Sequence, residues 1–577
     1  MPSLLTMSFE GELSPTFDLR CLRAAVNMPD GWGIGYYGGI EPCATVLKEA
    51  LPAADSGRSQ IARTGERMTS SLYLLHIRAA RWGRRAEANT QPFCRSYVRR
   101  DWLFGHAGSL EQRLELQAPR FEPVGSTDSE AIFCDLMTRI AARGWRSLRG
   151  ADLAVLHGWL EEINELGVLT AALSDGEDML VYADRRGVQR LYACEIVPPY
   201  PPAVLGDDDV RIELTKPETT PRRGVILTTN VLERESDLAA TWREVPPGSL
   251  VLLRRGVLVD ERAPQTPRPD DPPASAQPAP PSRPRAAPPR RLEVHHRTVY
   301  RYERPVEKST HVLRLEPVHD RLQRLASHHI ALSVDGKQSI YDDVFGNRAR
   351  RLVVETPYTE LVIESHAMVV TLDTDPLEFR PVHSRTSIPL NWMPWQRHML
   401  QPYLLPEELP ESQLNELHDY AMSFVARNGY DLVDSLLDMN RSIFRDYRYQ
   451  QGTTTQYTTP YEVYIGRQGV CQDFTNLFIC LARLLGIPAR YVCGYLYTGP
   501  KHENRAMSEA THAWAQVYLP EAGWKGFDPT NGVLTQTNHV RVAVGRHYTD
   551  ATPTSGTIFV GGGREELEVS VTVEEEG

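Results

Sequence analysis

The sequence predicts an α+β protein made of two folded regions joined by an extended tether. Three observations predict this arrangement. Short strand-like and helix-like runs alternate before residue 262, residues 263–290 combine many prolines with no aromatic or β-branched aliphatic residue, and a long stretch of period-two alternation follows residue 290 before helical segments begin. The chain has 577 residues, of which 41% are hydrophobic, so each region can bury its own core.

Charge and composition argue against two classes of partner. The net charge is −11 and the pI is near 5.9, whereas a nucleic-acid binder needs a concentrated basic face. The N-terminus lacks the basic segment, apolar core and cleavage site of a secretory signal, and no run of about 18 apolar residues occurs. We therefore expect a cytoplasmic protein that binds neither nucleic acid nor membrane.

Cysteine usage predicts reduced thiols. The eight cysteines are spread thinly over the chain, and none forms a CxxC pair. Neither a structural zinc ion nor another metal or cofactor is expected. The adjacent pairs His295-His296 and His328-His329 fall in strand-like segments, where neighbouring side chains point to opposite faces, and we interpret them as structural.

The region before the tether, residues 1–262, is expected to form a layered domain. Strands are predicted at 72–77, 102–105, 179–183, 224–229 and 250–254, and helices at 129–142 and 150–165. The tether itself, residues 263–290, has no side chains to bury in a core. Its proline content predicts a stiff, polyproline-like linker.

Residues 291–375 are predicted to form a small antiparallel β domain. LEVHHRTVYRYERPV alternates in period two, and so do 328–334 and 351–372, with Asp335-Gly336 between them as the expected hairpin turn.

Residues 376–577 are predicted to form a second, mixed domain with C-terminal strands. Helices are expected at 411–444 and 471–485, and strands at 490–497, 513–519 and 524–528. The helix that starts at Cys471 carries apolar residues at helical spacing and ends at Gly486 and Pro488.

Three residues in this last region could carry acyl-transfer chemistry. GVCQDF, THAW and GFDPTNG supply a thiol at Cys471, a base at His512 and an orienting carboxylate at Asp528. The amides of a helix N-terminus and a nearby imidazolium both favour the thiolate form of a cysteine. The backbone amide of Cys471 is a candidate oxyanion donor, and Tyr457 is a weak candidate for the second. A metal site made from the same three residues is disfavoured, because they lack paired ligand spacing.

These motifs carry a family resemblance. TVYRYERPVEKSTHVLRLEP, GVCQDFTNLFICLARLLGIPARYVCGY, ATHAWAQVYLP and GWKGFDPTNG make residues 291 to about 575 resemble the bacterial transglutaminase-like family, a branch of the papain-like cysteine superfamily. The resemblance implies Cys471 as nucleophile, His512 as base and Asp528 as orienter. It leaves the reaction open, because such folds host transglutaminases, peptidases and amidases. Three aromatic residues could wall an acyl-binding groove, although such residues are more often core: Tyr495, Tyr497 and Trp514.

Residues 1 to about 260 resemble class II glutamine amidotransferases through MPSLLTMS, DGWGIGYY, LHIRAA, NTQPF, FGHAGSL and GSTDSEAIF. The resemblance implies the αββα sandwich of the N-terminal nucleophile hydrolases. It also implies that Arg78 grips the carboxylate of a glutamine-like ligand, that Asp128 holds the α-ammonium group and that Gly108 stands at the oxyanion turn. An alternative is that Arg78 and Asp128 are only structural ion partners.

The same region departs from its family at two positions. Pro2 stands where the family carries its nucleophilic cysteine, and Ala107 stands where it carries an asparagine that steadies the oxyanion. We therefore predict a pseudo-glutaminase that holds a ligand or a partner protein without cleaving it.

The combined prediction is a cysteine-dependent enzyme that transfers or hydrolyses acyl groups of peptide, protein or glutamyl amides in its C-terminal domain. The resemblance adds a peptide-bond-forming ligase as a candidate partner. Two alternatives stay open: a non-catalytic binding or scaffold protein, and a glutamine amidotransferase that is active in the N-terminal domain.

Overall fold

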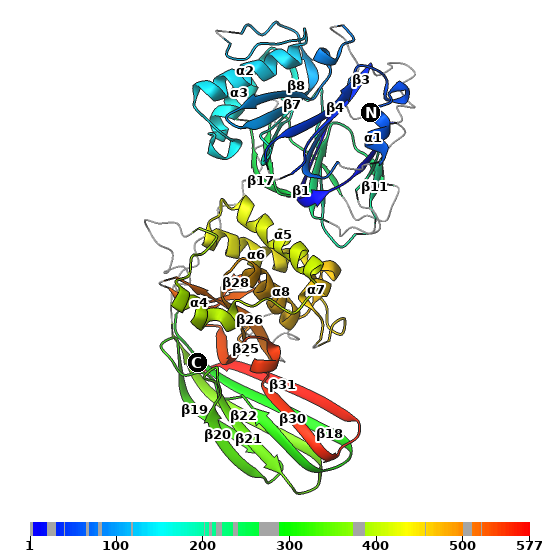
Figure 1. Cartoon of the computed structure of the whole chain (residues 1–577). Coiled ribbons are helices and arrows are strands. Elements are labelled where there is room, and N and C mark those ends of the chain that lie inside the picture. The colour runs from blue at the N-terminus through cyan, green and yellow to red at the C-terminus, as the bar shows by residue number, and fades with distance from the viewer. Residues whose placement is uncertain are drawn as a thin grey trace. The chain divides into compact units, whose positions relative to one another are not determined.

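The computed structural model describes residues 4–576 except for 20–29, 40, 65–67, 79–83, 117–118, 201, 207–209, 215–221, 235–240, 265–287, 373–386, 456, 500–510 and 521. The chain divides into two compact units, Met1–Pro280 and Pro281–Gly577 (Figure 1). Most of the predicted tether therefore lies outside the described residues. No helix in the described parts of the chain combines the length and the apolar character that a bilayer span requires.

Two antiparallel sheets stack face to face in the first unit (Figure 1). Sheet A runs in the order β15 (Trp242–Glu244), β10 (Tyr192–Ile196), β13 (Gly224–Thr228), β1 (Leu4–Leu13), β5 (Ser70–Arg78), β3 (Gly31–Tyr37) and β4 (Ala44–Glu49). Sheet C runs in the order β17 (Val257–Arg262), β16 (Leu250–Arg254), β9 (Asp178–Tyr182), β8 (Gly167–Ser174), β7 (Arg100–Leu110) and β6 (Phe93–Tyr97). Leu74 and Val225 of sheet A pack with Leu103 and Val181 of sheet C, and alternation along each strand produces this shared apolar layer.

Helices cover the outer face of sheet C. They are α2 (Asp128–Ala142) and α3 (Leu153–Glu165), and each begins at a side-chain cap, from Thr127 and Asp152 respectively. Phe133 of α2 stacks on Phe104 of β7 with ring centroids 5.2 Å apart. The outer face of sheet A packs against a small sheet B and the short helix α1 (Ser59–Thr64). Sheet B runs in the order β14 (Glu233–Arg234), β11 (Val204–Gly206), β12 (Val210–Glu213) and β2 (Thr16–Leu19).

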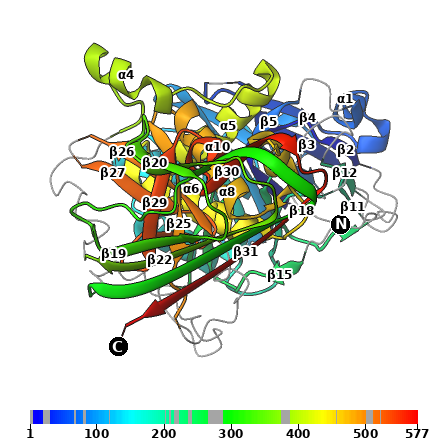
Figure 2. The ribbon, with the colours of Figure 1, turned by 90° about the horizontal axis from the view of Figure 1, so that it is seen from below.

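The second unit contains a β domain built around one long strand, β18 (Arg290–Leu313), as Figure 2 shows. The sheet order is β19 (Gln323–Leu332), β22 (Tyr358–Thr371), β18, β21 (Arg348–Val354) and β20 (Lys337–Asp342). The C-terminal strands β30 (Thr554–Gly561) and β31 (Glu565–Glu575) also pair with β18. The sheet therefore combines strands that precede the helical part of the second unit in the sequence, β18 to β22, with strands that follow it, β30 and β31.

The predicted hairpin turn at Asp335-Gly336 is wrong. The strands on either side of it, β19 and β20, lie at opposite ends of the sheet order and pair with β22 and β21 instead. The local signal described a reversal of the chain, but each strand pairs with a partner further along the chain, and β20 is exposed along its whole length.

The core of the second unit packs helices on a five-stranded sheet. The helices are α4 (Pro394–Leu400), α5 (Glu411–Arg427), α6 (Leu432–Asp446), α7 (Pro460–Gly466), α8 (Cys471–Leu484) and α10 (Tyr548–Ala551). The sheet order is β28 (Val533–Leu534), β27 (Gly523–Asp528), β26 (His512–Leu519), β25 (Ala489–Leu496) and β29 (His539–Gly545), and β23 (Arg448–Tyr449) pairs separately with β24 (Gln468–Gly469). Phe478 of α8 stacks on Phe527 of β27 at 5.5 Å, so α8 is fixed against the strands that carry the candidate residues.

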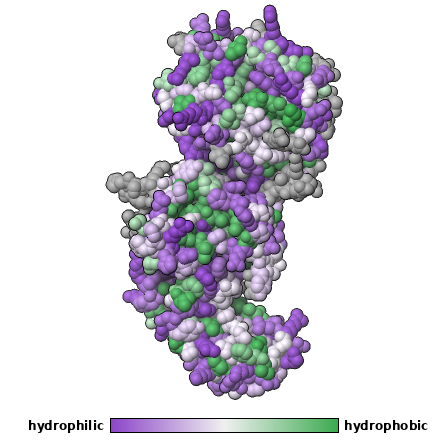
Figure 3. All heavy atoms as spheres, viewed as in Figure 1, coloured by the Kyte–Doolittle hydropathy of each residue, from purple (hydrophilic) through white to green (hydrophobic). Residues whose placement is uncertain are grey.

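The β domain packs on the far face of this sheet through an apolar cluster that includes Val294, Val369, Tyr495 and Val540. On its other face, β18 of the β domain turns polar residues such as Glu293, Arg297 and Arg301 outward. Figure 3 shows hydrophilic and hydrophobic residues interspersed over the visible surface of the protein. The predicted α+β class is confirmed. Strands occur in both regions where the sequence predicts them, residues 1–262 and 291–375, and the helix predicted at 471–485 is α8.

Candidate active site

Cys471 is the first residue of α8. Val470 before it is extended, and the Asp473 carboxylate accepts the Val470 N–H at 2.8 Å and the Thr454 hydroxyl at 2.7 Å. The helix start is therefore fixed by one side chain. Amides in the first turn of a helix have no acceptor within the helix, so Cys471 lies beside N–H groups that favour negative charge. Its side chain is partly exposed, as a nucleophile requires.

His512 is the first residue of β26 and lies opposite Gly494 of β25. A side chain at Gly494 would clash with the Val540 carbonyl oxygen, at 2.1 Å from an added Cβ, so this crossing of strands needs glycine. The His512 Nε2–H donates to Asp528 Oδ2 at 2.9 Å. Cys471 lies near enough to raise the pKa of His512, and because Nε2 is turned to Asp528, Nδ1 is the ring nitrogen left for the sulfur.

Asp528 ends β27 with its carboxylate fully buried and fully hydrogen-bonded. Oδ2 accepts from His512, from His539 Nε2 at 3.1 Å and from the Asn531 amide at 2.7 Å. Oδ1 accepts the backbone N–H groups of Thr530 at 3.0 Å and of Asn531 at 3.2 Å. These donors fix the carboxylate orientation, and the carboxylate in turn fixes the His512 ring.

The electrostatics of the site favour an ion pair. Burial opposes the charged form of His512, but the Asp528 carboxylate and Cys471 outweigh it and raise the pKa of His512 to about 10. Burial likewise opposes ionisation of Asp528, yet His512 and His539 hold its pKa well below the usual range. His512 is therefore protonated and Asp528 ionised at neutral pH.

Sequence reasoning missed His539 and Asn531 as partners of Asp528. Asn531 belongs to GFDPTNG and follows Asp528 by three residues, so its spacing could have identified it as a turn donor. His539 opens β29, and no local motif marks it. Its Nδ1 accepts the Gln536 N–H at 3.4 Å, so its Nε2 carries the proton that it donates to Asp528.

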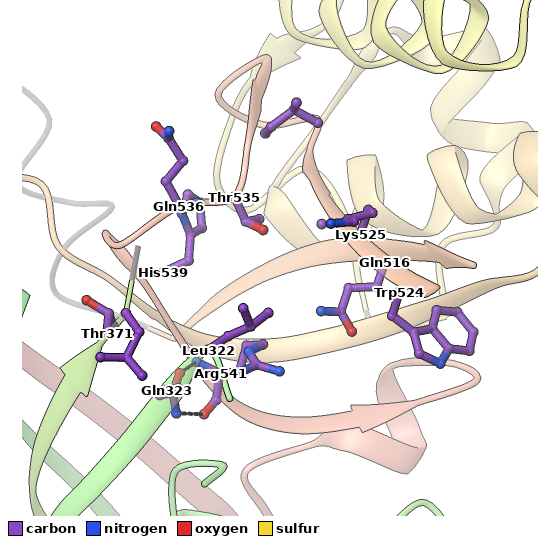
Figure 4. A pocket seen from close by; sticks show the side chains of 13 residues that line it. Leu322, Gln323, Thr371, Gln516, Trp524, Lys525, Thr535, Gln536, His539 and Arg541 are labelled. Atoms are coloured by element: carbon purple, nitrogen blue, oxygen red, sulfur yellow. Dashed lines mark hydrogen bonds between the residues drawn. The ribbon is translucent and has the colours of Figure 1, made fainter. Parts of the chain in front are cut away.

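A polar pocket lies next to His539, where β27, β28 and β29 meet the β domain (Figure 4). Lys525, Gln536 and Arg541 line it with His539, and its volume is about 60 Å³. The Arg541 guanidinium is engaged by Asp320 at 2.6 Å. The pocket has room for a few water-sized groups beside His539, the second histidine that hydrogen-bonds Asp528.

Two predicted groove residues lie inside the protein. Trp514 and Tyr495 are 0% and 2% exposed, and the Tyr495 hydroxyl contacts His296 Nδ1 at 3.1 Å. The groove prediction is wrong for these two, because the first packs in the core and the second joins the two sheets. Tyr497 lies under the Arg290 guanidinium, and Tyr457 is 80% exposed.

His512, Asp528 and His539 are residue types that bind metal, and one donor atom from each lies within 4.8 Å of the others. Both rings, however, direct an N–H at the same carboxylate oxygen. A metal would have to replace both protons in a buried network whose acceptor is already satisfied. The arrangement fits a hydrogen-bonded network better than a ligand set.

In the first unit, Arg78 ends β5 with a side chain that is 6% exposed and paired with Asp30. A backbone N–H from Asp30 also donates to the Arg78 carbonyl oxygen at 2.9 Å. Arg78 is thus held within the fold, and a ligand carboxylate would share it with Asp30.

Gly108 and Asp128 lie close together. Gly108 has a φ of +148°, and a Cβ there would meet the Val168 carbonyl oxygen at 2.1 Å, so only glycine fits. Two residues on, the Leu110 N–H donates to Asp128 Oδ2 at 2.8 Å. Ala107, next to Gly108, is 3% exposed and offers no side-chain donor, and Pro2 lies outside the described residues.

Comparisons with known families agree with the two halves of the fold. Residues 1–277 match "Glutamine amidotransferases class-II". Residues 292–370 match "Bacterial transglutaminase-like N-terminal region", and 419–529 match "Transglutaminase-like superfamily".

Similar proteins come from several bacteria. An uncharacterised protein of Mycobacterium tuberculosis H37Rv is 34% identical over 300 residues, which are 49% of this chain and 92% of the relative. The "Putative glutamine amidotransferase YafJ" of Escherichia coli K12 is 31% identical over 232 residues, which cover 39% of this chain and 86% of YafJ. A solved structure described as a "Putative Cysteine Protease" from Cytophaga hutchinsonii is 20% identical, covers 50% of this chain and 92% of its own, and has a TM-score of 0.41.

The matched families use cysteine-type acyl-transfer chemistry. The chain therefore belongs to the class II glutamine amidotransferases through residues 1–277 and to the bacterial transglutaminase-like proteins through residues 292–370 and 419–529.

Proposed function

We propose that the second unit is a cysteine acyltransferase or peptidase that acts on peptide or glutamyl amides, with Cys471 as nucleophile, His512 as base and Asp528 as orienting carboxylate. One observation carries the proposal: the His512 ring is hydrogen-bonded to the buried Asp528 and lies near enough to Cys471, at the start of α8, for the cysteine to raise the pKa of His512. Nucleophile, base and orienter in this order are the requirements for covalent acyl transfer.

The geometry supports the following steps. The Cys471 thiolate attacks the amide carbonyl carbon, and the His512 imidazolium gives its Nδ1 proton to the departing amine as the C–N bond breaks. Neutral His512 then takes a proton from water or from an amine, which attacks the thioester and releases either a carboxylic acid or a new amide. Asp528 stays ionised throughout, because five donors satisfy its oxygens.

Two donors are proposed for the oxyanion, one at the start of α8 and one in β23. The Cys471 N–H is the first, because it lies in the opening turn of α8. Tyr449 is our candidate for the second, in place of the exposed Tyr457. Burial and then the nearby Cys471 raise the pKa of Tyr449, so its phenol stays protonated and can donate.

For the first unit we propose a pseudo-glutaminase that binds a glutamine-like ligand or a partner protein, such as a peptide ligase. The sequence keeps Arg78, Gly108 and Asp128 but carries Pro2 in place of a nucleophile. The buried Arg78–Asp30 pair also supports the alternative that Arg78 is structural.

A labelling and turnover experiment tests the enzyme proposal. Wild type, Cys471→Ala and the control Cys43→Ala, which removes an exposed thiol of the first unit, are treated with an iodoacetamide probe near pH 7. Each protein is also incubated with amide peptides, with or without an added amine. We expect loss of fast labelling and of turnover in Cys471→Ala alone. Mass changes separate hydrolysis from amine incorporation. Equal turnover by wild type and Cys471→Ala would refute the proposal.

A further inference from the structure

Three histidines lie in one row across three neighbouring strands of the β domain. His295 of β18 is directly opposite His366 of β22, and His366 is directly opposite His329 of β19. Residues that face each other in an antiparallel pair point to the same side of the sheet. Glu364 precedes His366 by two residues on β22, so its side chain lies on the same side of the sheet. All four therefore belong to one face, which alternation leaves toward solvent.

We propose that His295, Glu364 and His366 form a binding site for a divalent transition metal ion, with zinc as the best match. The two imidazole rings stack with centroids 4.0 Å apart and an interplanar angle of 17°. One donor atom from each of the three side chains lies within 4.8 Å of the others. Donors around tetrahedral zinc are about 3.3 Å apart for bonds of about 2.0–2.1 Å, so small side-chain rotations are enough to close the site.

The surroundings of the His295 ring favour its binding to a metal ion. Its Nε2 is buried and has no hydrogen-bond partner among the described residues. A buried ring nitrogen without a partner costs free energy that binding to a metal would recover. His366 beside it is exposed, which gives an ion a route from solvent to the pair.

Glu364 can join the site at little cost. Its present partner is Arg297, at 3.2 Å, and the two side chains are 38% and 36% exposed. An exposed pair of this kind contributes little to stability, so the carboxylate is free to turn toward a cation. His329, at the far end of the row, lies outside this set of three donors, and water can complete the coordination.

The donor set selects the metal class. Two imidazoles and one carboxylate suit zinc, with copper and nickel as competitors, whereas calcium and magnesium prefer sets made of oxygen ligands. A bound ion would link β18 to β22 across the solvent face. This proposal departs from our interpretation of His295 as structural, because that interpretation lacked the strand register and His366.

The test uses the full, untagged chain in a Cys471→Ala background, so that the active-site thiolate does not bind the added metal. Zinc is titrated against a chromophoric chelator, and cobalt absorption in the visible range reports the donor geometry. His366→Ala removes an exposed ligand without disturbing the core. His418→Ala, which removes an exposed histidine on α5, is the matched control.

We expect one zinc equivalent to bind, with affinity at least tenfold lower in His366→Ala and unchanged in His418→Ala. Zinc should raise the melting temperature of the background protein and of His418→Ala, but not of His366→Ala, and Glu364→Gln should fall between them. Equal zinc affinity in His366→Ala and His418→Ala overturns the proposal. So does binding that His366→Ala retains and His539→Gln abolishes, because that result places the ion at the buried Asp528 network.

Discussion

The chain carries two polar sites whose residues are held in opposite ways. In the first unit, Arg78 is paired with Asp30, and Asp128 accepts the Leu110 N–H, so both side chains serve the fold. In the second unit, Asp528 accepts a hydrogen bond from the His512 ring, and the partly exposed Cys471 lies near enough to raise the pKa of that ring. The polar contacts of Arg78 and Asp128 involve only groups of the fold, whereas those of Asp528 lead through His512 toward a cysteine that can react.

This difference explains how ligand-holding residues can persist without a nucleophile. A buried arginine that loses its carboxylate partner, or the reverse, leaves an uncompensated charge, so selection for stability alone retains both. Residues such as Arg78 therefore say little about activity by themselves. The informative feature is whether a network terminates at a group that can form a covalent bond.

The largest expected effect comes from breaking the active network at its buried end. Asp528→Asn keeps the side-chain shape but removes the charge that holds His512 protonated and oriented. We expect kcat/KM for amide turnover to fall about 10³-fold, with KM nearly unchanged. Steady-state kinetics on the best peptide amide measure the effect. A loss of less than tenfold would show that His512 is oriented by other contacts.

The next effect tests the first unit by adding what it lacks. Pro2→Cys supplies a nucleophile, and Ala107→Asn supplies an amide donor beside Gly108. Because one oxyanion donor is worth about 10²-fold in rate, we expect the double variant to release glutamate from glutamine about 10²-fold faster than Pro2→Cys alone.

The background for this comparison is Cys471→Ala, so that the second unit contributes no glutamate. An additional Arg78→Leu change should abolish the gain if Arg78 grips the ligand carboxylate. If the double variant with Arg78 intact stays inactive, the site has lost more than its nucleophile and donor, and a purely structural role for Arg78 and Asp128 is favoured.

The three candidate catalytic residues of the second unit could be predicted from the sequence, for a physical reason. Cys471, His512 and Asp528 lie at boundaries of helix and strands, where local motifs mark turns and caps, and the helix after Cys471 has clear apolar periodicity. His539 is different. It reaches Asp528 only because β29 pairs with β25, and pairing between strands distant in sequence leaves no local signal.

The same limit explains the errors. Asp335-Gly336 has turn chemistry, but which strands pair is decided by burial across the whole sheet. Trp514 and Tyr495 alternate correctly along their strands, yet the face they occupy is covered by the β domain, so they form core and not a groove. Sequence reasoning identified the elements and missed what covers them.

The third prediction concerns stability and pH. The pKa of His512 is raised to about 10, from an ordinary value of 6.5. This shift stabilises the fold fully below pH 6.5, and the stabilisation is lost as the pH rises through 10. Asp528, whose pKa is depressed, stays ionised over that whole range. Between pH 7 and 9 we expect the second unit to lose about 2 kcal/mol of stability from His512.

Hydrogen exchange of the α8 amides measures this loss in the second unit alone. After correction for intrinsic exchange, protection should fall about 30-fold from pH 7 to pH 9 in the wild type. His512→Gln has no titrating ring and should show little slope. Equal slopes in the two proteins would contradict an ion pair between His512 and Asp528 in the folded state.

The smallest effect separates the two histidines of the Asp528 network. His539→Ala removes one donor from Oδ2 but leaves His512, Asn531 and two backbone amides in place. We expect kcat to fall about tenfold, the range typical when a group that orients a catalytic side chain is lost. KM should not change, because His539 acts on Asp528 and not on the substrate.

The pH profile distinguishes this positioning role from loss of structure. With one donor fewer, the Asp528 carboxylate should hold the His512 proton more strongly, so the alkaline limb of kcat, where the imidazolium loses its proton, should move upward in His539→Ala. His539→Gln keeps an N–H that can reach Asp528 and should restore both kcat and the alkaline limb. A tenfold loss without any shift of the limb, unrelieved by glutamine, would mean that His539 supports β29 and the neighbouring pocket instead of the carboxylate. That outcome would reduce the active network to the three residues that the sequence motifs mark.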